Sequence, residues 1–176
     1  SRGFPSGLLD LAGFRKPRAW FRESLWSDKP MVYIGTFPAP GDAASLHFDA
    51  LPLWNYAEGD SVRIAAYTNC QEVQLLLDGE KIGPAKRYDA AAGVIYWEFP
   101  FRPGRLEAVG YSAGAEAARF VIATSKAPHA IQARQVNGFS GPRSVAQVEL
   151  QIVDADGRPV LLADNEITCT TAGPVG

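Results

Sequence analysis

The stretch Glu72-Val73-Gln74-Leu75-Leu76-Leu77-Asp78-Gly79-Glu80-Lys81 carries the clearest fold signal in this sequence. Val73, Leu75 and Leu77 recur at every second position, which is the pattern of a β-strand with one face turned to a core. Asp78-Gly79 follows at once, and this dipeptide favours the tight turn of a two-residue hairpin. The segment therefore predicts an antiparallel β-hairpin within an all-β fold.

Short apolar runs surround this hairpin, and turn residues separate them. Gly occurs 17 times and Pro 13 times among the 176 residues, which is typical of a β-domain with many turns. The runs that predict strands, besides the one above, are 31–37, 61–68, 94–99, 105–111 and 116–123. This spacing predicts an immunoglobulin-like β-sandwich over residues 28–124. The faces of 105–111 stay unassigned, because apolar side chains occur at both alternating sets of positions.

The segment from Lys16 to Trp26 departs from the strand pattern and predicts a short helix. Pro17 suits the first helical position, and the approach to Pro30 ends the helix, because a residue that precedes proline avoids the helical region. Four side chains share one stripe at helical spacing: Trp20, Phe21, Ser24 and Leu25. A helix with this many aromatic side chains needs a large apolar partner surface.

A second set of strands follows a polar joint at residues 124–128 and is predicted at 129–135, 144–154 and 166–171. About fifty residues cannot bury a full two-sheet core, because domains below about 60 residues are already marginal. We therefore expect 125–176 to be the start of a second, truncated immunoglobulin-like sandwich, and we favour truncation over completion by another chain.

Charge and composition exclude several classes of function. The 17 basic and 19 acidic residues leave a net charge of −2, so the chain has no electrostatic footprint for nucleic acid. No apolar run approaches the roughly 20 residues that span a bilayer, so no membrane partner is expected. Two Cys and two His are too few for a zinc site, so we expect free thiols at Cys70 and Cys169, no metal and no cofactor.

Several strings follow one another in a distinctive order: Gly7 to Arg18 running into Ser24 to Val32, Tyr67 to Leu75, Pro103 to Tyr111, and Val153 to Val160 with Ala163-Asp164-Asn165. In this order they resemble the family 2 glycoside hydrolases of the β-galactosidase type. By this resemblance, residues 1–27 correspond to the last turn and outer helix of a catalytic (β/α)₈ barrel. Residues 28–124 and 125–176 correspond to the accessory sandwiches that follow the barrel in many bacterial members.

The resemblance implies a parent enzyme that hydrolyses O-glycosidic bonds, with a periplasmic or secreted location. Its barrel would be the partner of this chain, and the aromatic helix would pack either on that barrel or on the adjacent sandwich. Retaining hydrolysis uses two carboxylates about 5–5.5 Å apart. The family's two glutamates lie on barrel strands that this chain lacks, so no catalytic residue is assigned here, and the chain alone should be inactive.

The chain's own acids are expected to be structural. Glu98 and Glu107 flank one turn, and we expect solvated strand-face acids. The group of Asp154, Asp156 and Asp164 could suggest Ca²⁺, but Asp-Ala-Asp-Gly is also ordinary turn chemistry, which we favour.

Two alternative functions stay open. A carbohydrate-binding module could use Trp54 and Tyr56 as a sugar-stacking platform, because flat apolar sugar faces pack on aromatic rings; interfacial packing of these two rings is the competing interpretation. Trp97 is expected in the core. Arg2 and Phe4 could border the substrate pocket in the parent. The other alternative is a tandem immunoglobulin-like spacer or adhesion segment, which the apolar helix argues against.

Overall fold

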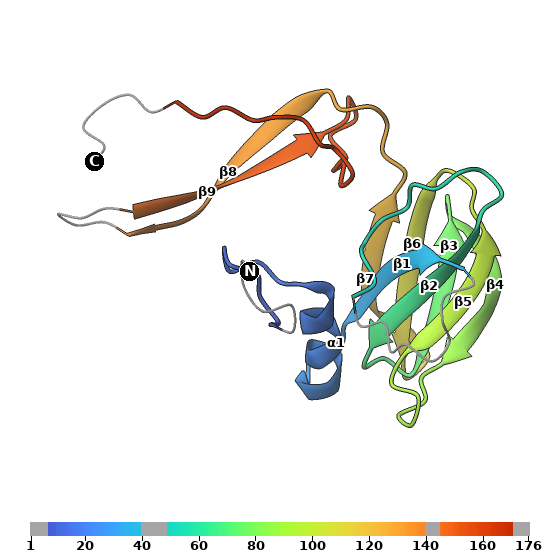
Figure 1. The fold of residues 1–176 in the computed structure, drawn as a ribbon. Coiled ribbons are helices and arrows are strands. Elements are labelled where there is room, and N and C mark those ends of the chain that lie inside the picture. Colours follow the sequence, from blue (N-terminus) through green and yellow to red (C-terminus); the bar gives the residue numbers. More distant parts are fainter. Residues whose placement is uncertain (1–6, 40–48, 140–144, 171–176) are drawn as a thin grey trace. The chain divides into compact units, whose positions relative to one another are not determined.

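The computed structural model describes residues 7–39, 49–139 and 145–170. The chain divides into two compact units, residues 1–124 and 125–176, which are described separately below. Figure 1 shows their strands and the helix in chain order.

The first unit is a sandwich of two antiparallel sheets. One sheet has the order β1-β2-β5, with β1 at Val32–Pro38, β2 at Ser61–Thr68 and β5 at Ile95–Pro100. The other has the order β4-β3-β6-β7, with β4 at Glu80–Arg87, β3 at Glu72–Leu77, β6 at Arg105–Ser112 and β7 at Ala115–Ala123. The immunoglobulin-like sandwich that the sequence predicts is thereby confirmed.

The core lies between the two sheets and uses the alternating positions that the sequence indicates. Val73, Leu75 and Leu77 of β3 point into it, as predicted from their spacing. The other sheet contributes Val62, Ile64 and Ala66 of β2 and Ile95 and Trp97 of β5, and β6 contributes Leu106 and Ala108. The predicted core position of Trp97 is confirmed.

The hairpin turn between β3 and β4 has the backbone that its residues favour. Asp78 and Gly79 have φ values of 51° and 86°, so both central residues of the turn have positive φ. The Asp78 Oδ1 also accepts a hydrogen bond from the Arg105 N–H at 2.8 Å, which ties the turn to β6. The sequence marks this turn but not the full extent of β4, whose largely exposed residues carry no clear alternation.

Helix α1 (Pro17–Trp26) packs on the outer face of the three-stranded sheet, against β1 and β2. Phe21 and Ser24 are its buried residues, as the stripe predicts. Leu25 was expected on the same buried stripe, but its side chain is 42% exposed, so this part of the prediction is wrong. The second buried cluster of this unit lies beneath α1 and includes Tyr33, Ala65, Tyr67 and Val94. The β1-β2-β5 sheet is therefore covered on both faces.

The second unit is built on a two-stranded antiparallel sheet, β8 (Ala130–Phe139) with β9 (Val145–Val153). Ile131 lies opposite Ile152 on an apolar face, and the other face carries the polar pairs Gln132–Gln151 and Arg134–Glu149. The sequence predicts a strand at 166–171, of which the structure describes residues 166–170. These residues belong to no strand, so the prediction is wrong for them. An extended segment becomes a strand only when a neighbouring backbone pairs with it, and no ladder includes these residues.

Candidate functional site

Trp54, one of the two aromatic residues proposed for sugar stacking, lies inside the sandwich. Its side chain is 1% exposed, and its ring meets that of Phe101 at 5.1 Å in a T-shaped contact. The indole N–H donates to the Arg102 carbonyl at 3.1 Å. A ring enclosed in this way presents no free face to a sugar in this structure.

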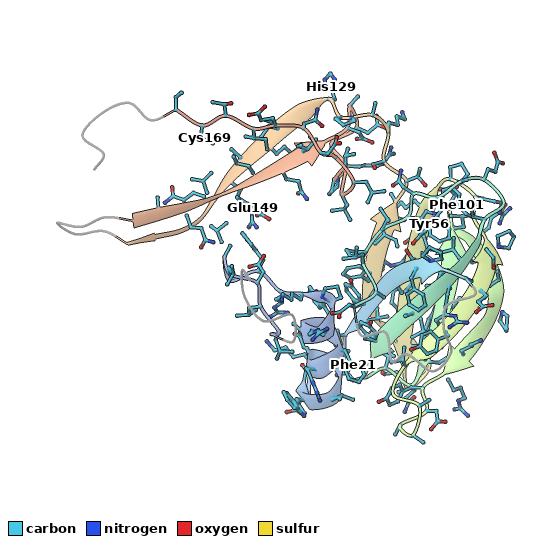
Figure 2. All side chains as sticks on the ribbon, in the orientation of Figure 1. Phe21, Tyr56, Phe101, His129, Glu149 and Cys169 are labelled. Atoms are coloured by element: carbon cyan, nitrogen blue, oxygen red, sulfur yellow. The ribbon has the colours of Figure 1, made fainter. Side chains whose placement is uncertain are left out.

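Tyr56 lies at the edge of the same aromatic group. Its ring centroid is 5.9 Å from that of Phe101, and the two are seen together in Figure 2. The Thr36 hydroxyl donates to the Leu53 carbonyl and lies 2.7 Å from the Tyr56 hydroxyl, which therefore acts as the donor to Thr36. Burial raises the pKa of Tyr56. The sugar-stacking platform of Trp54 and Tyr56 stays a prediction.

The two strand glutamates that flank one turn in the sequence do not come together. Glu98 lies on β5 and pairs with Arg63, whose Nε is 2.7 Å away. Glu107 lies on β6 in the opposite sheet and pairs with Arg105 and Arg119. Their chain neighbours point into the core between the sheets, so both carboxylates face outward from opposite layers.

Glu107 also corrects an expectation, because its carboxylate is buried and not solvated. The arginine side chains of Arg105 and Arg119 extend over it from neighbouring positions of the same sheet. Arg119 bridges onward to Glu116 at 2.8 Å, and these two carboxylates raise the pKa of Arg119. A buried carboxylate between two guanidinium groups is a structural ion-pair network.

Asp154 and Asp156 of the predicted aspartate group lie in one turn of the second unit, and Asp164 lies outside that turn. The buried Asp154 carboxylate accepts hydrogen bonds from the backbone N–H groups of Lys126, Asp156 and Arg158 at 2.8–2.9 Å. These bonds, the Lys126 one first, lower the pKa of Asp154. Asp156 instead pairs with Lys126 at 3.0 Å and with Arg158 at 2.6 Å. Among the described residues no group of three or more His, Cys, Asp or Glu side chains is arranged to hold a metal ion.

Both cysteines are free thiols, Cys70 buried and Cys169 exposed. Arg2 and Phe4, the residues proposed to border a substrate pocket, lie outside the described residues. Within the described part of the chain, no helix is long and apolar enough to cross a membrane.

An aromatic stack that the strand pattern does not indicate joins α1 to the sandwich. Tyr33 lies between Trp20 and Tyr67, with ring centroids 5.5 and 5.4 Å away and the planes nearly parallel. Phe21 meets the edge of Tyr67 at 5.6 Å, and Figure 2 labels Phe21 on the helix. The Tyr33 hydroxyl donates to the Ala50 carbonyl at 2.7 Å. Burial raises the pKa of both Tyr33 and Tyr67.

The residues just before and at the end of α1 form the main exposed apolar feature of the first unit. The large exposed apolar side chains among the described residues of this unit are Leu8, Leu9, Leu11, Leu25, Trp26, Leu51 and Val121. Five of these seven lie within residues 8–26. Exposed apolar side chains are therefore more frequent in this segment than in the rest of the unit that the structure describes.

Comparison with known proteins identifies the class to which this fold belongs. The sequence family described as "Domain of unknown function (DUF4982)" matches residues 59–118, most of the sandwich. A solved structure of a glycosyl hydrolase family 2 member from Bacteroides cellulosilyticus is similar to this chain, with 29% sequence identity and a TM-score of 0.77. The match covers 88% of this chain and 22% of the chain in that structure.

Two curated relatives match almost the whole chain. The β-galactosidase BoGH2A of Bacteroides ovatus is 26% identical over 95% of this chain, and a β-glucuronidase of Formosa agariphila is 24% identical over 96%. This chain spans 18% and 16% of the length of these two relatives. The fold and the matches together define a β-sandwich region of a glycoside hydrolase. The chain is a region of a family 2 member, as the resemblance predicts.

Proposed function

We propose that this chain is a non-catalytic accessory region that follows the catalytic barrel of a family 2 glycoside hydrolase and braces it. The parent would hydrolyse a β-galactoside or β-glucuronide, by analogy with the relatives' names. Residues 1–27 would be the end of the barrel, 28–124 the first sandwich, and 125–176 the opening of a second.

The observation that carries this proposal is the role of the acids in the sandwich. Glu98 and Glu107 are each held by arginine on the outer faces of opposite sheets. A retaining glycosidase needs two carboxylates on either side of one sugar, about 5–5.5 Å apart, with one kept protonated. Glutamates that face outward from opposite layers cannot act on the same glycosidic bond. Their arrangement supports a scaffold, with the chemistry located elsewhere in the parent.

Substitution of these glutamates in the full-length parent tests the proposal. We expect Glu98→Gln and Glu107→Gln to leave kcat/KM for nitrophenyl β-galactoside or β-glucuronide within roughly twofold, because neither side chain would touch the substrate. Circular dichroism melting of each variant serves as the folding control. A loss of roughly a hundredfold or more in kcat, with the melting temperature unchanged, would place a catalytic group in this region and refute the proposal.

A further inference from the structure

We infer that Asn69 is a positioning residue that fixes the linker between α1 and β1, so that α1 and the sandwich move as one rigid body. The linker comprises residues 27–31, between the end of α1 at Trp26 and the start of β1 at Val32. Without the Asn69 side chain, this linker would act as a hinge. The inference uses only contacts within the first unit, and it does not depend on the proposed function.

The linker has no regular structure of its own. Its five residues, all of which the structure describes, belong to no helix or strand, and Asp28, Lys29 and Pro30 are exposed. A few residues at the ends of elements are enough to absorb the change in backbone dihedrals of a hinge motion. A fixed position of α1 therefore depends on contacts from outside the linker.

Asn69 supplies such contacts with its side-chain amide. Its Nδ2 donates to the carbonyls of Ser27 and Lys29, both at 2.8 Å. Its Oδ1 accepts the backbone N–H of Met31, also at 2.8 Å. Two acceptors on one side and one donor on the other match the NH₂ group and the oxygen of an amide, so these partners define its orientation. An ionised aspartate has nearly the same shape but can only accept.

The position of Asn69 follows from the register of β1 and β2. The last pair of this antiparallel ladder is Val32 with Thr68. Met31 and Asn69 come next, and the Met31 N–H bonds to the Asn69 side chain instead of a backbone carbonyl. The Thr68 hydroxyl also donates to the Met31 carbonyl at 2.7 Å. The linker is thereby attached to the end of β2, in the sheet on which α1 packs.

Helix α1 depends on this attachment because it has few local sources of stability. It has ten residues, and isolated helices shorter than about 12–15 residues are marginal in water. Among the described residues, its N-cap Lys16 makes no side-chain capping hydrogen bond. At the other end, the Ser27 N–H donates to the Glu23 carbonyl at 2.9 Å, and the Ser27 carbonyl accepts from Asn69. Asn69 therefore holds the residue that ends the helix.

Two attachments fix α1, one along its side and one at its end. Along its side, Trp20 stacks on Tyr33. Phe21 meets the edge of Tyr67. The apolar part of such packing is non-directional, whereas hydrogen bonds prefer a narrow range of angles. The Asn69 bonds therefore set the angle at which the helix packs on the sheet.

For the proposed function, this linker is the place where the bracing would act. Residues 1–27 are proposed to be the end of the barrel, so a hinge at 27–31 would let the sandwich move relative to it, and a fixed linker would not. The glutamate substitutions above test the accessory role, and the exchange measurements below test only Asn69. Either proposal can therefore fail while the other stands.

The test compares Asn69→Asp with Asn69→Ala in the 176-residue chain by backbone hydrogen exchange. Asn69→Asp keeps an acceptor for the Met31 N–H but places a carboxylate against two carbonyl oxygens. Asn69→Ala removes all three hydrogen bonds without adding a charge, and it is the second variant should the first not fold. The readout is the exchange rate at residues 21–27 and at Lys29, whose own hydrogen-bond acceptors neither variant alters. Asn165→Asp, at an exposed position of the second unit, is the control for the change in charge.

We expect these amides to exchange at least about tenfold faster in Asn69→Asp and about threefold faster in Asn69→Ala, while amides of β3 and β6 stay within about twofold of wild type. Asn165→Asp should leave all of these rates unchanged. Equal acceleration throughout the first unit would overturn the inference, because Asn69 would then support only global stability. Wild-type exchange rates at residues 21–27 and Lys29 in both Asn69 variants would also overturn it.

Discussion

At the scale of single residues, burial separates side chains that look alike in the sequence. Trp54 and Tyr56 both lie in an irregular segment before a strand, so no periodicity assigns either of them to the core. The structure encloses Trp54, with its indole N–H satisfied by the Arg102 carbonyl, and leaves Tyr56 half-buried. A ring that packs against Phe101 from within the core acts as a structural anchor.

We therefore expect Trp54→Ala to destabilise the chain by about 3–5 kcal/mol, because it would leave a large cavity in the core. Tyr56→Phe should cost only about 1 kcal/mol, the worth of its hydrogen bond to Thr36. Urea denaturation of both variants measures the difference. The assignment would be contradicted if Trp54→Ala kept wild-type stability and lost affinity for a galactoside in a fluorescence titration.

At the scale of secondary structure, the sequence predicts those elements whose burial follows a single period. This group includes strands β2, β3 and β5 and helix α1. The faces of β6 could not be assigned because both are buried: Leu106 faces the core, while Glu107 is covered by Arg105 and Arg119. Ion pairing across neighbouring strands leaves no periodic signal in the sequence.

Other elements depend on partners that the sequence does not specify. The outward-facing Ala65 and Tyr67 of β2 are buried in a cluster that also contains Phe21 of α1, Ala50 and Val94. The aromatic helix was predictable to a similar extent: its composition predicts packing on an apolar surface, but the division of its side chains between buried and exposed positions required the structure.

Two substitutions on α1 test that division. Phe21→Ala should destabilise the isolated chain by about 2–4 kcal/mol, because it removes a buried ring that packs on Tyr67. Leu25→Ala should change stability by less than about 0.5 kcal/mol, because the side chain is exposed and alanine favours the helix. Chemical denaturation of the two variants compares them directly. Similar losses in both would contradict the helix orientation.

At the scale of the whole molecule, different interactions stabilise the folds of the two units. The first has a large apolar core between two sheets, whereas the second relies on one hairpin and the Asp154 turn. A two-stranded hairpin is marginal in water without a further layer. Polar contacts such as those of Asp154 therefore matter more to the second unit.

The lowered pKa of Asp154 predicts a local response to acid in the second unit. Its folded pKa lies below the unfolded value of about 3.9, so its stabilisation is present above about pH 4 and is lost as pH falls through the folded pKa. Amide exchange at Asp156 and Arg158, corrected for its intrinsic pH dependence, should lose protection in that range. Asp154→Ala should lose it already at neutral pH, because alanine has no side-chain oxygen to accept these two N–H groups. Protection that stays unchanged at low pH would contradict the role of this carboxylate.

The central claim is that this region supports a glycosidase without carrying its chemistry. The most direct test is the hydrolysis of nitrophenyl β-galactoside and nitrophenyl β-glucuronide by the purified 176-residue chain, measured beside the full-length parent. We predict hydrolysis by the parent of at least one of these substrates and no turnover by the chain above the buffer rate. Turnover by the chain that persists through repeated purification would contradict the account.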